Sequence, residues 1–284
     1  MNKNLKALYG LKYNPFSPEL PLEALQVTSK TEDFLWRIEN GLAMEGGFAM
    51  ITGAPGTGKS VVMRLLHERL ERLREVVVGS LEHPQSNLAD FYREMGDLFG
   101  VILRPHNRWA GFRSLREKWI SHIETTLMRP VLLVDEAQQM NPAVLSELRI
   151  LASTRFDSRS ILGVVLAGDS RLSEKLRNEE LLPLGSRIRT RLLLEHASVE
   201  DLRGCLLHQI KAAGNLKLMT TELVDTLCEH AIGNHRMLAT MANELLEVAA
   251  QREIDQLDEK LYLDVFATPA TAEKNPTRRT GPAR

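Results

Sequence analysis

The stretch from Met50 to Ser60 constrains the fold more than any other part of the chain. Residues 53–60 read Gly-Ala-Pro-Gly-Thr-Gly-Lys-Ser, which fits the phosphate-loop pattern G-x-x-x-x-G-K-[ST]. The residues from Gly47 to Thr52 predict a short buried strand before the loop, and those from Val61 to Arg72 predict a helix after it. The alternative is a glycine-rich turn that matches the pattern by chance. Such a turn would not require a strand before it and a helix after it in this register. The stretch therefore predicts an α/β fold built around a bound polyphosphate.

The loop also predicts how the polyphosphate is held. Glycines let consecutive backbone N–H groups turn inward around phosphate oxygens, and the dipole of the following helix favours negative charge there. Lys59 is expected to reach the β- and γ-phosphates, and the Ser60 hydroxyl is expected to bind Mg²⁺. The predicted nucleotide-binding residues of this stretch are Gly53, Pro55, Gly56, Thr57, Gly58, Lys59, Ser60 and Val61.

A second apolar run ends in two carboxylates. Residues from Pro130 to Val134 predict a strand that is buried on both faces of a parallel sheet, and Asp135 and Glu136 follow it directly. Asp135 is expected to bind Mg²⁺, and Glu136 to polarise the water that attacks the γ-phosphorus. A pair of carboxylates that caps a helix is the alternative.

Strands and helices alternate through the first two thirds of the chain. Further strands are expected at residues 76–81, 160–169 and 192–195, with helices at 31–42, 88–99, 114–127 and 141–153. The alternation implies βαβ crossovers and helices on both faces of the sheet. Residues 198–265 contain only helical patterns, which predicts a small all-α domain. We therefore expect an amino-terminal arm (1–22), an α/β nucleotide-binding domain (23–196), a helical lid (197–266) and a disordered tail (267–284).

The composition indicates an ordinary globular protein and not a disordered or fibrous one. The 284 residues carry a formal net charge of −1, and apolar and charged residues make up 43% and 26% of the chain, as in ordinary globular proteins. This near-neutral net charge does not by itself indicate nucleic-acid binding, so any basic surface that binds DNA would have to be local. The two cysteines, Cys205 and Cys228, are expected to be buried free thiols. Without an apolar leader or a run long enough to span a membrane, we expect a soluble cytoplasmic protein with no membrane partner.

Polar residues at two further points are candidates for the nucleotide site. Asp169 ends an apolar strand, where it would contact the attacking water or the γ-phosphate; a turn-forming Gly-Asp-Ser is the alternative. Arg187, Arg189 and Arg191 lie just before the last expected strand. An arginine there that reached the γ-phosphate of a neighbouring subunit would make hydrolysis depend on assembly, whereas a solvated basic face is the alternative.

These motifs, in this order and spacing, resemble the AAA+ ATPases. They are Gly53–Ser60, Leu132-Leu-Val-Asp-Glu-Ala-Gln138, the arginines of Arg187-Ile-x-x-Arg191, and Gly233-x-x-Arg236. The resemblance implies a P-loop AAA+ sheet between helices, a helical lid, and ATP and Mg²⁺ as cofactors. It assigns Lys59 and Ser60 to Walker A, Asp135 and Glu136 to Walker B, Asp169 to sensor 1, Arg187 or Arg191 to the arginine finger, and Arg236 to sensor 2.

Two segments resemble one particular branch of this family. Tyr9-Gly-Leu-Lys-Tyr-Asn-Pro-Phe16 and Asp135-Glu-Ala-Gln138 are similar to the ExeA/GspA branch, which also holds the transposon ATPases of the TniB and TnsC type. Gly168-Asp169-Ser170 departs from the Gly-Gln-Pro that is usual in the secretion-type members. Those members carry a membrane span and a cell-wall-binding region after the ATPase, whereas this chain ends in a short polar tail. The expected function is therefore ATP-dependent regulation of DNA transposition.

The transposition regulators imply a set of partners. ATP-bound subunits would assemble on double-stranded DNA as a ring or helical filament, mark a target, and recruit a transposase, with or without a targeting adaptor. Basic residues with Trp109 and Phe112 between them, in a stretch predicted to break the helical pattern, are the DNA-contacting candidates: Arg104, Arg108, Arg113, Arg116 and Lys118. The alternative is an exposed loop and helix face without a DNA-binding role, with Trp109 packed inward.

Two other functions stay open at this point. The ATPase could power an interaction adaptor of a secretion or envelope assembly in which no nucleic acid takes part. It could also be a nucleotide-sensing switch of the signalling type, in which the arginine finger would be idle.

Overall fold

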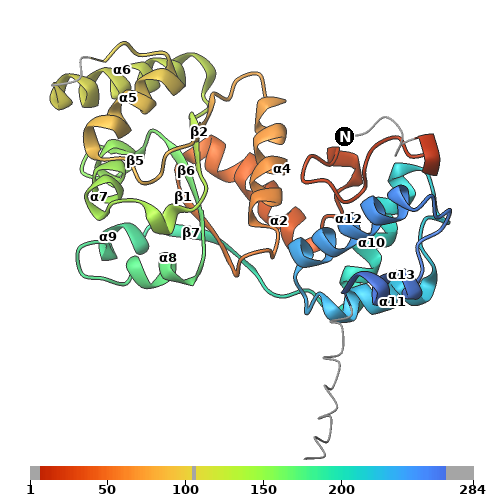
Figure 1. The fold of residues 1–284 in the computed structure, drawn as a ribbon. Coiled ribbons are helices and arrows are strands. Elements are labelled where there is room, and N and C mark those ends of the chain that lie inside the picture. The colour runs from red at the N-terminus through yellow and green to blue at the C-terminus, as the bar shows by residue number, and fades with distance from the viewer. Residues whose placement is uncertain (1–6, 104–106, 267–284) are drawn as a thin grey trace, which may run out of the picture.

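The computed structural model describes residues 7–103 and 107–266. Figure 1 shows an α/β lobe and a helical lobe, which are joined where the chain enters the α/β lobe and where the chain leaves it. The strands are β1 (Gly47–Gly53), β2 (Val78–Leu81), β3 (Val131–Val134), β4 (Ser153–Thr154), β5 (Arg159–Ser160), β6 (Gly163–Gly168) and β7 (Ile188–Leu194). Helices α2 to α9 are Ser29–Arg37, Ala43–Glu45, Lys59–Glu71, Leu88–Phe99, Arg108–Thr126, Pro142–Leu151, Ser170–Lys175 and Leu182–Gly185, and α10 to α13 are Val199–Ala213, Thr221–His230, His235–Gln251 and Glu259–Phe266. Two short 3₁₀ turns, η1 (Leu22–Ala24) and η3 (Ala137–Gln139), and a π-helical segment, η2 (Ile38–Leu42), complete the elements.

The main sheet has five parallel strands in the order β2-β3-β6-β1-β7. Strand β6 lies between β1, which leads into the phosphate loop, and β3, which leads into Asp135. Because parallel strands end at the same edge, the phosphate loop, the acidic pair and Asp169 gather there.

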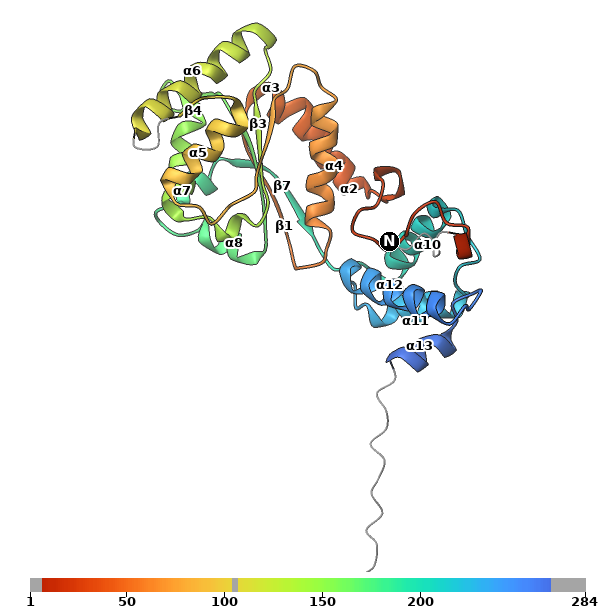
Figure 2. The same cartoon turned by 45° about the horizontal axis from the view of Figure 1, so that its top comes forward.

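Alternate residues of the central strands face two different cores. Ala49 and Ile51 of β1 pack with α2 and α4, whereas Phe48 and Met50 pack with α5, α6 and α7. Figure 2 shows the sheet edge-on between these two layers of helices. The near-continuous apolar runs of β3 and β6 follow from this burial on both faces. The predicted parallel sheet between helices is confirmed.

The helical lobe has a core of its own. It is formed by α10 to α13, and the amino-terminal arm contributes Tyr9, Leu11 and Phe16 to it. The Tyr9 hydroxyl donates to the Ile254 carbonyl at 2.8 Å, and the Asn14 amide donates to the Asn243 side chain at 2.7 Å. The arm therefore forms part of the core of the helical lobe, although the two are far apart in the sequence. No helix in the described part of the chain is both long and apolar enough to cross a bilayer.

Two expected boundaries are wrong. The last strand begins at Ile188 instead of Leu192, so Arg189 and Arg191 lie inside β7. The sequence of this strand alternates polar and apolar residues because β7 is at the edge of the sheet, which hides it from a search for apolar runs. The helix expected from Ser114 begins at Arg108, with the Asn107 side chain as its cap. The predicted disordered tail, 267–284, lies outside the described residues.

Candidate nucleotide-binding site

The phosphate loop runs from the end of β1 to the first turn of α4. Gly56 and Gly58 have φ angles of 82° and 99°, a left-handed backbone that other residues rarely adopt. The Thr57 hydroxyl donates to the Ala54 carbonyl at 2.8 Å, which closes the turn. The loop therefore holds the compact form that its sequence predicts, with the first turn of α4 directly after it. It contains the predicted residues Gly53, Pro55, Gly56, Thr57, Gly58, Lys59 and Ser60, and Val61 follows in α4.

Lys59 and Ser60 point toward the interior of this site. The Lys59 ammonium donates to the carbonyl oxygens of Gly53 and Ala54, at 2.9 and 3.1 Å, and the residue is 6% exposed. The Ser60 hydroxyl donates to the Asp135 carboxylate at 2.8 Å, although the two residues are 75 positions apart in the chain. The hydroxyl and carboxylate that the sequence assigned to one metal ion are thus in direct contact.

These oxygen ligands fit Mg²⁺. Within residues 7–103 and 107–266 no group of three or more His, Cys, Asp or Glu side chains could hold a metal ion by itself. Mg²⁺ does not require such a group, because it binds one or two protein oxygens and completes its shell with phosphate and water. Ser60 and Asp135 would hold the ion, which would neutralise charge on the phosphates of a bound nucleotide.

Glu136 adopts a strained conformation at the end of β3. Its φ of 52° and ψ of 36° lie in the left-handed region, which is uncommon for a residue with a side chain. Its exposed carboxylate accepts hydrogen bonds from the side-chain amides of Gln138 and Gln139. Strain of this kind costs about 1–3 kcal/mol and is concentrated at functional sites. The conformation separates Glu136 from Asp135, so that adjacent carboxylates have different contacts.

Gln138 is a site residue to which the sequence motifs assigned no role. It is 6% exposed, and its side-chain oxygen accepts from the Asp169 backbone N–H at 3.4 Å while its amide donates to Glu136. It therefore links the ends of β3 and β6. The signal that could have found it is its place in the motif Asp135-Glu-Ala-Gln138, directly after the acidic pair.

Asp169 caps a short helix and binds a neighbouring arginine. Its carboxylate accepts from the Arg171 backbone N–H at 2.9 Å and from the Arg171 guanidinium at 2.6 to 3.1 Å. The hydrogen bonds from the Arg171 side chain are the main reason that the pKa of Asp169 is lowered. The turn-forming role that was the alternative is present, and Asp169 still lies at the phosphate edge of the sheet.

The helical lobe touches the phosphate loop through Asn234. The Asn234 amide donates to the Pro55 carbonyl at 3.2 Å, and its oxygen accepts from the backbone N–H groups of Arg236 and Met237. A side chain at position 56 would collide with Asn234, so Gly56 is required by this contact as well as by its φ. Arg236 is exposed in the first turn of α12, next to the loop. An Asn directly before a helix is a cap signal that could have singled out Asn234.

Arg187 and Arg191 lie away from this edge. Arg187 comes directly before β7, whose first residue, Ile188, is paired with Phe48 near the start of β1. Because β1 has seven residues and a strand rises ~3.3 Å per residue, Arg187 is roughly 20 Å from the phosphate loop of its own subunit. Its guanidinium pairs with the Asp157 carboxylate. Arg191, which is paired with Met50 in the middle of the sheet, donates to the Gly185 carbonyl at 3.0 Å.

Several of the DNA-contacting candidates are held by the domain itself. Arg108 pairs with the buried carboxylate of Glu147, and Arg116 donates to the carbonyls of Ile150 and Ser153. Arg113 pairs with Glu117 on the surface, whereas Lys118 is exposed, and Arg104 lies outside the described residues. Trp109 is 72% exposed, so it is not packed inward; it stacks on Phe112 with an interplanar angle of 10°.

Arg108 is expected to stabilise the fold. Glu147 is 4% exposed and also accepts from the Tyr92 hydroxyl, and burial is the main cause of the raised pKa of Tyr92. Arg108→Ala would leave this carboxylate without its cation, so the free energy of unfolding, measured by urea denaturation, should fall by about 1–3 kcal/mol. Arg113→Ala, which breaks an exposed pair on the same helix, is the control and should change little. Weaker DNA binding by Arg108→Ala at unchanged stability would contradict this role.

Both cysteines are free, as predicted. Cys228 is buried, Cys205 is partly buried, and burial raises the pKa of each thiol to about 11. These thiols are therefore poor nucleophiles near neutral pH.

Comparison with known proteins agrees with this geometry. Residues 42–176 match the family model described as AAA domain. The chain has the P-loop AAA+ fold. It is 30% identical to General secretion pathway protein A of Aeromonas hydrophila over 248 residues, which are 86% of this chain and 44% of that protein. The chain thus spans less than half the length of this curated relative, and the similarity agrees with the predicted resemblance to the ExeA/GspA branch.

Two solved structures from Aeropyrum pernix have the same fold. The Aeropyrum pernix ORC2 protein, in ADPNP–ADP complexes, has a TM-score of 0.69 at 17% identity, over 90% of this chain and 72% of that one. The Aeropyrum pernix ORC1 protein in complex with DNA has a TM-score of 0.62 at 17% identity, over 87% of this chain and 67% of that one. At these identities the likeness shows the fold alone.

Proposed function

We propose that this AAA+ chain is a Mg²⁺-dependent ATPase whose site is completed by a neighbouring subunit, so that ATP controls assembly. The observation that carries the proposal is the position of Arg187, at the opposite end of β1 from the phosphate loop. Side chains do not reach across such a distance. An Arg187 that acts on ATP must act on the ATP of another subunit, as arginine fingers do in trans.

The other roles follow from the contacts around the loop. Lys59 would exchange two carbonyl partners for phosphate oxygens, which form stronger charge-assisted hydrogen bonds with an ammonium group. Ser60 and Asp135 would bind Mg²⁺, and Glu136 would accept a proton from the attacking water. Gln138 would orient Glu136, and Asn234 would keep Arg236 close to the phosphates.

We propose further that the assembly forms on double-stranded DNA and regulates transposition by marking a target and recruiting a transposase. Trp109, which is 72% exposed and stacks on the half-buried Phe112, supports nucleic-acid contact, because aromatic faces stack on bases. Arg113, four residues after Trp109, extends this exposed face, whereas Lys118 is exposed on the opposite side of α6. The ORC1 protein, whose structure was solved in complex with DNA, has the same fold as this chain.

Electron microscopy of the purified chain, with duplex DNA and a non-hydrolysable ATP analogue, tests this function. We expect rings or filaments that need both ligands, and a DNA affinity that falls steeply as salt rises. Lys59→Ala is the control variant, because the loss of a charged hydrogen-bonding partner should weaken ATP binding by ~3 kcal/mol, or about 100-fold, and prevent assembly. Free monomers in the wild-type sample, or assemblies of Lys59→Ala equal to those of wild type, would contradict the proposal.

A second candidate is an ATPase adaptor of a secretion or envelope assembly without nucleic acid. The specific observation in its favour is the 30% identity to General secretion pathway protein A. The same samples separate the two functions. ATP-dependent assembly that is indifferent to DNA, with no shift of duplex DNA in a gel at low salt, would favour the adaptor.

A further inference from the structure

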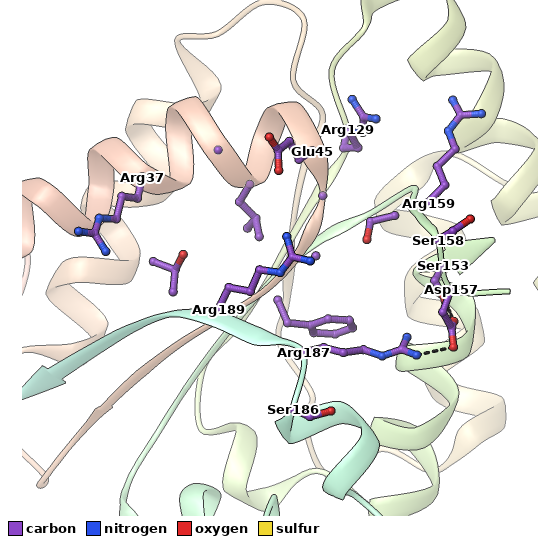
Figure 3. A pocket seen from close by; sticks show the side chains of 17 residues that line it. Arg37, Glu45, Arg129, Ser153, Asp157, Ser158, Arg159, Ser186, Arg187 and Arg189 are labelled. Atoms are coloured by element: carbon purple, nitrogen blue, oxygen red, sulfur yellow. Dashed lines mark hydrogen bonds and ion pairs between the residues drawn. The ribbon is translucent and has the colours of Figure 1, made fainter. Parts of the chain in front are cut away.

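A pocket lined by arginines lies at the edge of the sheet opposite the phosphate loop. Its volume is about 510 Å³, and it is formed by residues at the starts of β1 and β7, the end of α2, the chain before β3, and the β4–β5 hairpin. Five arginines line it, Arg37, Arg129, Arg159, Arg187 and Arg189, against two carboxylates, Glu45 and Asp157. Figure 3 shows Arg189 reaching into the middle of the pocket, with Arg37 and Arg159 on opposite sides.

The two carboxylates do not balance this charge. Asp157 is already used by Arg187, by the Ser153 hydroxyl, and by Arg149 at 3.6 Å, and the Arg187 hydrogen bond is the main reason that its pKa is lowered. Arg37, Arg159 and Arg189 form no ion pair or side-chain hydrogen bond with any described residue. Three cationic side chains from three separate elements therefore face one hollow without a partner.

Arg129 adds a buried donor at the same place. Its guanidinium donates to the carbonyls of Met44 and Leu127, but its Nε atom is buried and has no hydrogen-bond partner among the described residues. Burial and the nearby Arg159 lower the pKa of Arg129. A buried donor without an acceptor destabilises the fold, and crowding of like charges adds to this cost, unless an anion enters.

The size and chemistry of the pocket select the class of anion. A single carboxylate needs little volume, whereas 510 Å³ lies in the range of pockets for ligands with several groups. The forked donors of arginine match phosphate oxygens in pairs, and the hydroxyls of Ser160 and Thr190 offer further donors. A run of adjacent phosphates satisfies several separated guanidinium groups at once.

We propose that this five-arginine pocket is a second anion site, which binds a run of adjacent phosphates, either in a small polyphosphate or in a nucleic-acid strand. It lies beyond the reach of the phosphate loop of the same subunit, and Arg187 is the one arginine of the pocket that also has a role in the proposed ATPase function; the other four have none there. Arg187, paired with Asp157, forms its wall, and Arg37, Arg129, Arg159 and Arg189 supply the free charge.

Calorimetric titration of full-length Lys59→Ala protein tests the pocket, because this variant removes phosphate binding at the loop. The probes are inorganic tripolyphosphate and, in a separate arm, a 20-base-pair duplex. The test variant adds Arg159→Gln and Arg189→Gln, and a matched control adds Arg72→Gln and Arg74→Gln, which change the charge equally at exposed positions outside the pocket. We expect the affinity of at least one probe to fall at least 10-fold in the test variant and to change less than 2-fold in the control.

The two arms identify the source of the phosphates. Tripolyphosphate binding that is lost in the test variant supports a small polyphosphate ligand, and duplex binding lost alone supports a nucleic-acid strand. Failure of both probes to bind Lys59→Ala protein overturns the proposal, as does equal binding by test and control variants. A circular dichroism melt of each variant verifies that it is folded. The loss of ATP-dependent assembly would leave these titrations unaffected, so the two proposals fail separately.

Discussion

Arg187→Ala is expected to lower the rate of ATP hydrolysis in the assembled state by about 10³-fold, the smaller of the usual effects of removing an arginine finger. ATP binding, followed with a fluorescent ATP analogue, should change little, because Arg187 is roughly 20 Å from the phosphate loop of its own subunit. The combination of intact binding with lost turnover is what distinguishes a finger acting in trans from a residue of the loop itself.

Two matched variants control for the ion pair with Asp157. Asp157→Asn removes the charge that holds Arg187 but keeps the guanidinium, so it should retain turnover. Arg191→Ala removes the other candidate, which lies in the middle of β7 and donates to the Gly185 carbonyl of α9, and it should also retain turnover. If Arg191→Ala lost activity and Arg187→Ala did not, the finger would be Arg191.

Mixing two inactive proteins gives the sharper test. Lys59→Ala keeps its finger but does not bind ATP, whereas Arg187→Ala binds ATP but lacks the finger. Lys59→Ala subunits do not assemble by themselves, so they must join assemblies formed by ATP-bound Arg187→Ala subunits. With equal incorporation, up to about a quarter of the head-to-tail interfaces would join an intact loop to an intact finger. ATPase activity, measured by phosphate release, should therefore recover partly on mixing. A mixture no more active than its components would mean that Arg187 does not act across subunits, as expected of a nucleotide-sensing switch.

Glu136→Gln is expected to lower turnover by about 10²–10⁴-fold while ATP binding is retained, because glutamine cannot accept the proton of the attacking water. Lys59, Ser60 and Asp135, which would hold ATP and Mg²⁺, make their described contacts without the Glu136 side chain. The protein should therefore assemble with ATP and stay assembled, which sedimentation over time would detect.

Glu174→Gln provides the control for this substitution. Glu174 is an exposed carboxylate of α8 that makes no ion pair within the described part of the chain. Its replacement should leave turnover and disassembly at wild-type rates. Equal turnover by Glu136→Gln and wild-type protein would overturn the role assigned to Glu136, and Asp169 would then become the carboxylate to test.

The alternation of apolar runs with helical periodicity was enough to predict the sheet and the helices around it. The runs of β3 and β6 could be recognised because both of their faces are buried, and Asn87 and Asn141 could be predicted as helix caps because capping is local. Edge strand β7 was placed too late in the chain, since alternation of arginines with apolar residues resembles a loop. The start of α6 at Arg108 was missed although Asn107 is a local cap signal; the contact of Arg108 with Glu147, 39 residues away, was not visible in the sequence.

The sequence by itself determined the chemistry of the loop. Gly53 to Ser60 requires a phosphate-binding turn whatever surrounds it, because the glycines, the lysine and the hydroxyl act within one short segment. Only the tertiary structure decided which distant groups share its edge of the sheet: the contact of Ser60 with Asp135, the bridge from Gln138 to Asp169, and Asn234 on Pro55. It also put Arg187 at the other edge, inside a pocket of arginines. Strand order and register fix these distances, and both depend on packing between residues far apart in the chain, which no local pattern encodes.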